Sequence, residues 1–310
     1  MASRIQVGVL GQGGYMPGKK GFSIKQEVKG LVFVVPAFSF LAIFTLYPMI
    51  NAILNSFYNW NLGGRKRFVG LYNYQKMFSA DEIYMVLRNT LAYVVSILPF
   101  TIVLGFLLAV FLKRKSKLNV VYRTMIFTPH IASMVGLSVV WLYIFNPQYG
   151  ILNKVLTNMG FTPLRWVNDS STALLSIVIV TVWRMLGYNV IVYLGAIQNI
   201  PQEVIEAAHI DGAKGIRTVW NIIMPLVSPS TFMLLILNTI SVMKLFTTIE
   251  NMTGGGPGTS TANLVMMLYE YAFRQYQMGY ASAIAVLLFL LILAINLVQM
   301  SFERYVNYDV

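Results

Sequence analysis

The side chains best suited to catalysis or metal binding are few in this sequence. His130 and His209 are its only histidines, they stand far apart, and the chain has no cysteine. A zinc site or a catalytic centre brings several such groups together. We therefore expect both histidines to be structural, no metal or cofactor to be bound by this chain, and no enzyme activity of its own.

The segment from Gly13 to Lys20, GGYMPGKK, has glycine and lysine spacing similar to that of a phosphate-binding loop. Such a loop requires a serine or threonine directly after its lysine, and it follows a buried strand. Here a second lysine, Lys20, replaces the hydroxyl residue, and no buried strand precedes the segment. We interpret these residues as part of an N-terminal tail, residues 1–30, and not as a nucleotide site.

Apolar surroundings are indicated by the composition, because 57% of the 310 residues are hydrophobic, 11% are charged and the mean hydropathy is +0.65. A helix needs about 20 apolar residues to span a bilayer, and spanning segments must bond their own backbone groups. We therefore predict an all-α membrane protein with one membrane domain, 31–302, and a tail, 303–310. The six predicted spans are 31–50, 88–112, 123–145, 173–197, 222–248 and 281–302.

The net charge of +12 is carried mainly by lysines and arginines that flank these spans, which argues against nucleic acid as a partner. They are more numerous in the N-terminal tail, the 113–123 loop and the 200–229 loop than in the connections on the other side. The positive-inside rule then places both termini in the cytoplasm.

Two basic residues fall within the predicted spans, Arg184 near the middle of the fourth and Lys244 near the outer end of the fifth. A charge inside a bilayer usually faces a cavity, a partner or the interface, and snorkelling explains Lys244 well. Polar and aromatic side chains that could hold a solute lie at similar depth, although such groups also serve as contacts between helices. The candidate residues of a substrate pathway are Arg184, Tyr188, Asn189, Tyr193, Asn238 and Ser241.

The cytoplasmic loop from Ile200 to Pro229 carries the most specific pattern. Its early acidic residues predict a short helix from Gln202 to Asp211, which Gly212 can end in a left-handed conformation. The spacing of Ala207, Ala208 and Gly212 predicts a shared face of small residues that permits close approach of another surface. A second helical stretch should begin at Ile216 and bend near Pro225, so that the loop forms a docking element.

The spacing in this loop resembles the EAA loop of ABC importer permeases: Glu206, Ala207, Ala208, three residues, Gly212, nine residues, Ile222, one residue, then Met224 and Pro225. Met224 stands where leucine is usual. Further segments are similar to carbohydrate-uptake permeases related to the maltose and glycerol-phosphate systems. They are Ile210 to Ala213, Leu46 to Pro48, Thr253 to Gly258 with Ser260 and Thr261, and Gly279 to Ala283.

This resemblance implies a multi-pass permease in the inner membrane of a prokaryote, importing a sugar or oligosaccharide. It implies four partners: an ATP-binding subunit in two copies, which holds ATP and magnesium, a second homologous permease, an extracellular solute-binding protein, and the carbohydrate cargo. The ATP-binding subunit would dock on Glu206, Ala207, Ala208, Asp211, Gly212, Ile222 and Pro225. The binding protein would face the outer loop at Gly254, Gly255, Gly256 and Pro257.

One alternative keeps the importer and changes its cargo, and two others are different classes of protein. The same machinery could import glycerol phosphate or another polyol ester, for which Arg184 would supply a positive charge. An ion-coupled secondary transporter would favour carboxylates inside the spans, and here every Asp and Glu lies in a loop or at a span boundary. A membrane-embedded enzyme lacks a credible nucleophile, base or metal cluster at membrane depth.

Overall fold

The computed structural model describes residues 34–114 and 116–303. The N-terminal tail with its Gly13–Lys20 segment, the first three residues of the predicted span 31–50, and residues 304–310 lie outside the described residues. The chain divides after Ile50 into two parts, which are treated separately below.

The first part contributes most of one apolar helix, Val34–Asn55. A π-helical turn, η1 (Ala42–Leu46), interrupts it before α2 (Tyr47–Asn55), and the Tyr47 amide donates to the Ala42 carbonyl, five residues back. Pro48 stands two residues after this turn and lacks an amide hydrogen, so it cannot bond the preceding turn in the α-helical register. The helix therefore accommodates Pro48 without ending and continues beyond residue 50, the predicted end of the span.

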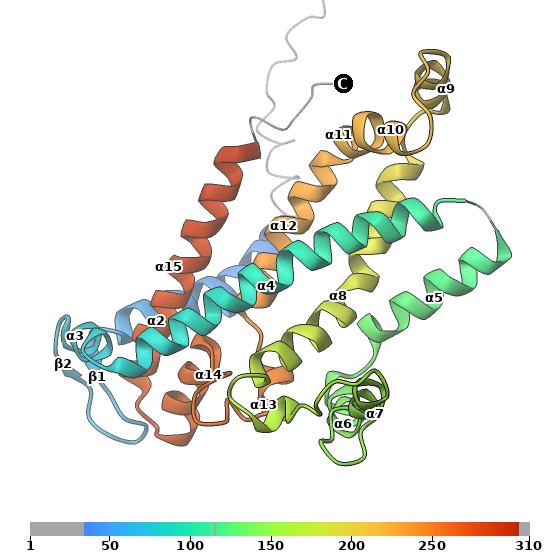
Figure 1. The fold of residues 1–310 in the computed structure, drawn as a ribbon. Helices are drawn as coiled ribbons and strands as arrows, with labels where there is room; N and C mark the ends of the chain where they lie inside the picture. Colours follow the sequence, from blue (N-terminus) through green and yellow to red (C-terminus); the bar gives the residue numbers. More distant parts are fainter. Residues whose placement is uncertain (1–33, 115, 304–310) are drawn as a thin grey trace, which may run out of the picture. The chain divides into compact units, whose positions relative to one another are not determined.

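The second part is almost entirely helical (Figure 1). A short hairpin pairs β1 (Tyr58–Asn59) antiparallel with β2 (Arg67–Phe68), with Tyr58 opposite Phe68. The helices that follow are α3 (Tyr72–Phe78), α4 (Asp81–Leu112), α5 (Lys117–Ile131), α6 (Met134–Ile144), α7 (Ile151–Asn158), η2 (Trp166–Asn168), α8 (Ala173–Gln198), α9 (Gln202–Ile210), α10 (Ile216–Thr218), η3 (Val219–Ile223), α11 (Met224–Leu226), α12 (Ser228–Met243), α13 (Thr247–Met252), α14 (Leu264–Tyr269), η4 (Glu270–Arg274) and α15 (Met278–Glu303).

Four helices in the described residues are long and apolar enough to cross a membrane by themselves, and two further pairs qualify only if each bent pair counts as one span. The single helices are Val34–Asn55, α4, α8 and α15. The predicted segments 88–112, 173–197 and 281–302 lie within α4, α8 and α15. The predicted segments 123–145 and 222–248 are each broken into two helices, so each remains one span only if its bent pair is counted together.

The first break separates α5 from α6, whose axes differ by 104°. Ala132 and Ser133 between them have extended backbone angles, and Pro129 lies in the last turn of α5. Because a proline donates no hydrogen bond within the helix, the turn that contains Pro129 is weakened where the chain changes direction.

The second break separates the stretch Ile216–Leu226 from α12, with a bend of 66°. Val227 stands at the break and has non-helical angles, between Pro225 and Pro229. The predicted bend near Pro225 is confirmed. α12 ends at Met243 with Lys244 as its C-cap, so the last five residues of the predicted span, 244–248, lie in the connection to α13 and at its start.

Glycines allow the central helices to approach closely. α4 packs along α8, and α5 packs on α8 as well. A Cβ on Gly105 of α4 would lie 2.8 Å from the Cβ of Asn189, and one on Gly187 of α8 would collide with the Ile126 carbonyl oxygen. Gly105 and Gly187 therefore mark the places where α4 and α5 come closest to α8.

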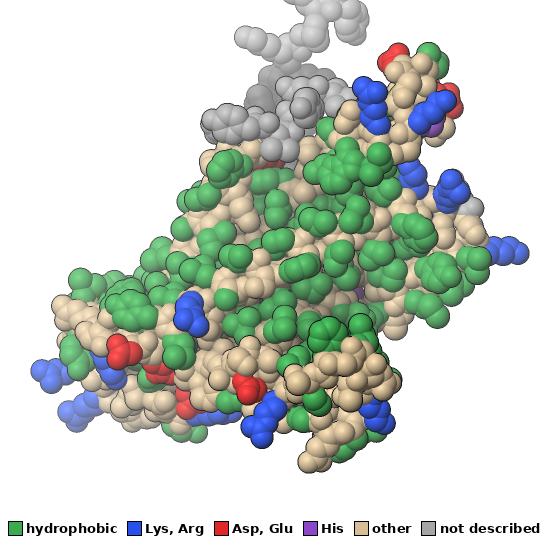
Figure 2. All heavy atoms as spheres, viewed as in Figure 1, with side chains coloured by type: hydrophobic (Ala, Val, Ile, Leu, Met, Phe, Trp, Pro, Cys, Tyr) green, Lys and Arg blue, Asp and Glu red, His purple; other side chains and the backbone are tan. Residues whose placement is uncertain are grey.

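Hydrophobic and charged side chains separate on the surface of this part. Figure 2 shows hydrophobic side chains covering the length of α4 and α5, while most Lys and Arg lie toward the end with α9 and α10 or toward the opposite end. The end that carries α9 and α10 also carries Lys117, the first residue of α5. The Arg123 guanidinium donates to the Leu112 carbonyl, which ties this end of α5 to the end of α4.

Candidate functional site

The loop that carries the EAA-like spacing forms the predicted short helix, α9, which ends in a defined cap. The Ala213 amide donates to the Ala208 carbonyl at 2.8 Å, and the Gly212 amide donates to the His209 carbonyl at 3.1 Å. Gly212 has φ of +84°, a conformation that glycine adopts without strain. These features define a Schellman cap. The predicted termination of the helix by Gly212 is therefore confirmed.

The predicted shared face of Ala207, Ala208 and Gly212 needs correction. Ala208 is 7% exposed and packs inward, whereas Ala207 is exposed. Neighbouring residues of an α-helix point about 100° apart, so the two alanines divide between the inner and outer faces. The outward surface carries Glu206, Ala207 and Ile210, and the Ile210 side chain is 87% exposed.

This outward surface is connected directly to the membrane helices. The Thr218 hydroxyl donates to the Ala213 carbonyl at 2.8 Å, so that α10 is joined to the cap of α9. Ile222 and Pro225 lie further along the same stretch, in η3 and α11. Figure 1 shows α9 beyond the ends of α8 and α12, with α10 and α11 leading into α12. The α9 helix is therefore joined to α12 by a short run of helical turns, α10, η3 and α11.

Four of the six predicted pathway residues line one cavity of about 380 Å³: Arg184 and Tyr188 from α8, and Asn238 and Ser241 from α12. The other lining residues are His130, Thr181, Met185, Leu237 and Leu245. This volume lies within the range of small-molecule sites.

The other two predicted residues, Asn189 and Tyr193, are fully buried outside the cavity lining. Asn189 accepts a hydrogen bond from the Asn238 amide at 2.8 Å and packs where Gly105 brings α4 close to α8. The Tyr193 hydroxyl donates to Thr231 at 3.0 Å, while its ring packs against Phe106. The structure gives both residues a place in helix packing.

His130 belongs to this cavity, although sequence reasoning treated it as structural. Its ring stacks on that of Tyr188, with centroids 5.2 Å apart. α5 brings His130 close to α8 because Gly187 lets the two helices meet. The sequence signal was present in the Pro129–His130 pair near the end of an apolar stretch, but only the packing of α5 on α8 reveals its partner.

The glycine-rich loop between α13 and α14 is held firmly by α4. The buried Asn89 amide donates to the carbonyls of Thr259 and Ala262 at 2.9 and 3.0 Å, and the Tyr93 hydroxyl donates to the Thr261 carbonyl at 2.9 Å. Gly254 and Gly255 both have positive φ. The loop therefore has one defined conformation, which glycine makes possible.

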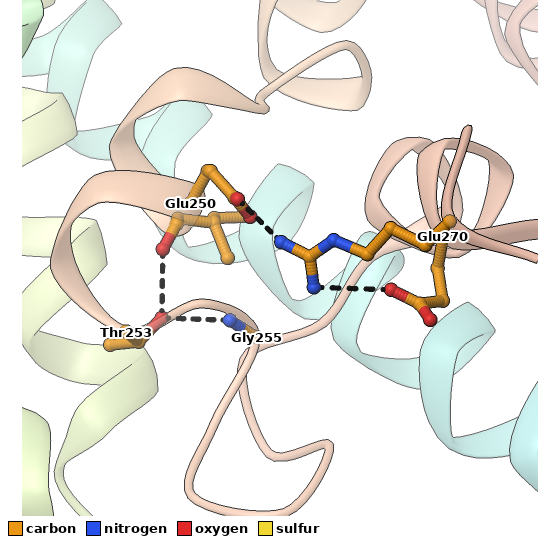
Figure 3. A network of polar contacts seen from close by, with 6 residues as sticks. Glu250, Thr253, Gly255 and Glu270 are labelled. Atoms are coloured by element: carbon orange, nitrogen blue, oxygen red, sulfur yellow. Dashed lines mark hydrogen bonds and ion pairs between the residues drawn. The ribbon is translucent and has the colours of Figure 1, made fainter.

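Gly254, Gly256 and Pro257 line an open, polar hollow of about 350 Å³, together with Asn168 and α13, whereas Gly255 faces Ala262. Beside it, the Arg274 guanidinium lies between two carboxylates, 2.9 Å from Glu250 and 3.2 Å from Glu270 (Figure 3). In the same region the pKa of Tyr271 is raised. The main cause is burial of its side chain, and the nearby Glu82 carboxylate adds to it.

The described residues contain no group of three or more His, Cys, Asp or Glu positioned to hold a metal ion.

A cavity between apolar helices, a protruding loop at one end and a polar loop at the other are features that suit a transport protein. Residues 101–308 match the family "Binding-protein-dependent transport system inner membrane component", and the chain belongs to this family. The protein is thus a multi-pass permease subunit of an ABC transporter and is not itself the catalytic subunit.

Full-length relatives agree with this assignment. The chain is 35% identical over 278 residues to the "Probable ABC transporter permease protein YurN" of Bacillus subtilis, covering 88% of this chain and 95% of the relative. It is 30% identical over 283 residues to the "sn-glycerol-3-phosphate transport system permease protein UgpA" of Pectobacterium atrosepticum, covering 90% and 95%.

The fold also matches a solved structure of a bacterial alginate ABC transporter in complex with an alginate pentasaccharide-bound periplasmic protein. The TM-score is 0.80 at 21% identity, and the match covers 91% of this chain and 96% of that chain.

Proposed function

We propose that this permease forms half of the translocation pathway of an importer for a sugar or polyol in a prokaryotic inner membrane, with both termini in the cytoplasm. A second homologous permease supplies the other half, and two copies of an ATP-binding subunit hold ATP and magnesium. An extracellular binding protein delivers the cargo. One relative is named as a permease for sn-glycerol 3-phosphate, and a protein of the same fold belongs to an alginate transporter. Both of these solutes are polar and carry hydroxyl groups, which supports a sugar or polyol as the cargo.

The observation that carries the proposal is the construction of the α9 loop. Helix α9 presents Ile210 at its tip, and Ile216, 75% exposed, follows the cap. Exposed apolar side chains with Glu206 and Asp211 beside them suit a protein partner better than water. In the proposed mechanism the ATP-binding subunit grips this surface, and α10 and α11 pass its closure on to α12.

The cargo pathway is proposed to run through the cavity lined by Arg184, Tyr188, Asn238 and Ser241. Its aromatic ring and hydrogen-bonding groups suit the apolar faces and hydroxyls of a sugar. The hollow at Gly254, Gly256 and Pro257 is proposed to face the binding protein. Because α4 holds this loop in one conformation, a partner could recognise its backbone without first having to order it.

Gly212→Asp tests the docking surface, and the chain offers a matched control. Gly160, with φ of +82°, ends α7 in the same type of cap, since the Phe161 amide donates to Leu156 and the Gly160 amide to Thr157. Neither glycine has any atom within 4 Å of an added Cβ. An aspartate should therefore cost about the same backbone strain at both positions, roughly 1–2 kcal/mol.

We expect Gly212→Asp to insert normally but to lose the ATP-binding subunit during purification, together with ATPase activity stimulated by the binding protein. Gly160→Asp should retain both. Full co-purification and stimulated ATPase activity in Gly212→Asp would show that α9 is not the docking surface. Isolation of the unaltered chain from its native membrane without any ATP-binding subunit would count against the importer itself.

A further inference from the structure

The cavity between α5, α8 and α12 has an unusual balance of charge. Arg184 and His130 are among its lining residues, and no aspartate or glutamate of the described chain lines it. Lys244, at the end of α12, lies between the lining residues Ser241 and Leu245 in the sequence. Among the described residues the cavity lining therefore carries the positive charge of Arg184 and no negative charge.

Arg184 has no carboxylate partner within the part of the chain that the structure describes. The ion pairs formed there are those of Arg274 with Glu250 and Glu270, in the outer region. The Nε atom of Arg184 is buried and has no hydrogen-bond partner among the described residues. A buried charge is costly unless an opposite charge or a set of hydrogen bonds compensates it, and within membrane spans such residues mark ligand or ion pathways.

The neighbouring groups are suited to a ligand that carries both an anionic group and hydroxyls. The Ser241 hydroxyl donates to the Leu237 carbonyl, so its oxygen remains able to accept a hydrogen bond. The stacked rings of His130 and Tyr188 offer an apolar surface, against which the C–H face of a sugar ring can pack. Arg184 then supplies the charged donors that a carboxylate or phosphate prefers.

We propose that this cavity selects an anionic cargo, a sugar or polyol that bears a carboxylate or a phosphate, with Arg184 as its counter-ion. The proposal rests on the proposed function, since it names the class of cargo that the importer carries. It predicts that anions enter the cavity more readily than cations of the same size, whether or not an ATP-binding subunit is present.

The absence of cysteine from the sequence allows a direct test in the full chain. Ser241→Cys places a thiol on the cavity wall, and Ser79→Cys provides a matched control, because both serines are exposed and both donate to the carbonyl four residues earlier. The probes are two thiol reagents of similar size, the anionic sulfonatoethyl and the cationic trimethylammonioethyl methanethiosulfonates. Their reaction rates are measured on each purified variant in lipid nanodiscs.

We expect the ratio of anionic to cationic reaction rates in Ser241→Cys to exceed that in Ser79→Cys by about tenfold. Adding Arg184→Gln should remove this preference at position 241, adding Arg184→Lys should preserve most of it, and neither should change the ratio at position 79. Equal ratios in the two single variants, or no reaction of Ser241→Cys with either reagent, would overturn the proposal. The comparison of Ser241→Cys with Ser79→Cys leaves Arg184 in place, so the proposal can be tested even if Arg184→Gln does not fold.

Protection of the thiol in Ser241→Cys distinguishes the two anionic groups. Glucuronate is compared with glucose, and glycerol 3-phosphate with glycerol, as added ligands that slow the labelling. Protection by one charged member and not by its neutral counterpart supports the proposal and names the group, whereas equal protection within both pairs, or none by any probe, overturns it. These measurements require no ATPase, so their failure is distinct from a failure of the Gly212→Asp test.

Discussion

At the scale of single residues, buried polar side chains give the glycine-rich loop between α13 and α14 its conformation. Asn89, Thr90 and Tyr93 lie close together on α4, and each is bonded to the segment 259–264. In a low-dielectric interior a backbone carbonyl without a donor is costly. These side chains supply the hydrogen bonds that the loop backbone would otherwise form within a helix or sheet. A residue such as Asn89 is therefore structural even though it is polar and close to a proposed partner surface.

Asn89→Ala should reduce the stability of the protein. The substitution leaves the Thr259 and Ala262 carbonyls without their donor, and we expect a loss of about 1–3 kcal/mol in the free energy of unfolding. Thermal unfolding in detergent measures the change. Asn119→Ala is the control. The Asn119 amide also donates to a carbonyl, that of Arg114, but this bond is exposed, so water can replace the lost donor. Equal melting temperatures for the two variants would contradict the anchoring role of Asn89.

At the scale of helices, close contacts at glycine decide which side chains meet. The α5–α8 contact depends on Gly187, because any side chain there would collide with the backbone of Ile126 and Phe127. The same contact brings His130 against Tyr188. The cavity and the helix crossing are thus two consequences of one packing arrangement.

Gly187→Leu should separate α5 from α8, lower the melting temperature and abolish the charge preference of the thiol in Ser241→Cys. Overpacking of this kind costs about 1–3 kcal/mol or more. Gly195→Leu is the matched control in the same helix, since nothing lies within 4 Å of an added Cβ there and leucine favours helix over glycine. A melting temperature of Gly187→Leu equal to that of Gly195→Leu would refute the contact as described.

At the scale of the whole molecule, charge predicts how the permease is oriented. The end of the second part with α9 and α10 carries Lys117, Arg123, Lys214 and Arg217, and the positive-inside rule assigns such an end to the cytoplasm. In the proposed orientation the cavity lies between the proposed docking surface on α9 and the proposed binding-protein surface at the glycine-rich loop. This arrangement is what alternating access to one cavity requires.

Cysteine labelling in intact cells tests the orientation. A membrane-impermeant maleimide should modify Ser79→Cys, near the outer hairpin, and leave Ser116→Cys, in the loop between α4 and α5, unmodified until the cells are permeabilised. Both serines are exposed in the structure. Inside-out vesicles should show the reverse pattern. Labelling of the Ser116→Cys variant in intact cells would contradict the proposed topology.

Local sequence determined the features that depend on residues close together in the chain. Apolar length located α4, α8 and α15, since a helix in lipid must bond its own backbone. Acidic residues at the start of α9 and Gly212 at its end predicted that helix and its cap, because capping involves only a few neighbouring residues. The bend near Pro225 followed from the missing amide hydrogen of proline.

Tertiary structure alone decided the features that depend on distant contacts. The burial of Ala208 and the exposure of Ala207 follow from how α9 packs on α10, and the separation of Asn189 and Tyr193 from the cavity follows from their partners on α4 and α12. The 104° turn between α5 and α6 lies just beyond the point where His130 meets Tyr188. Side-chain type and spacing identified the polar candidates, but helix packing determined which of them surround a cavity, because that choice depends on every neighbouring helix at once.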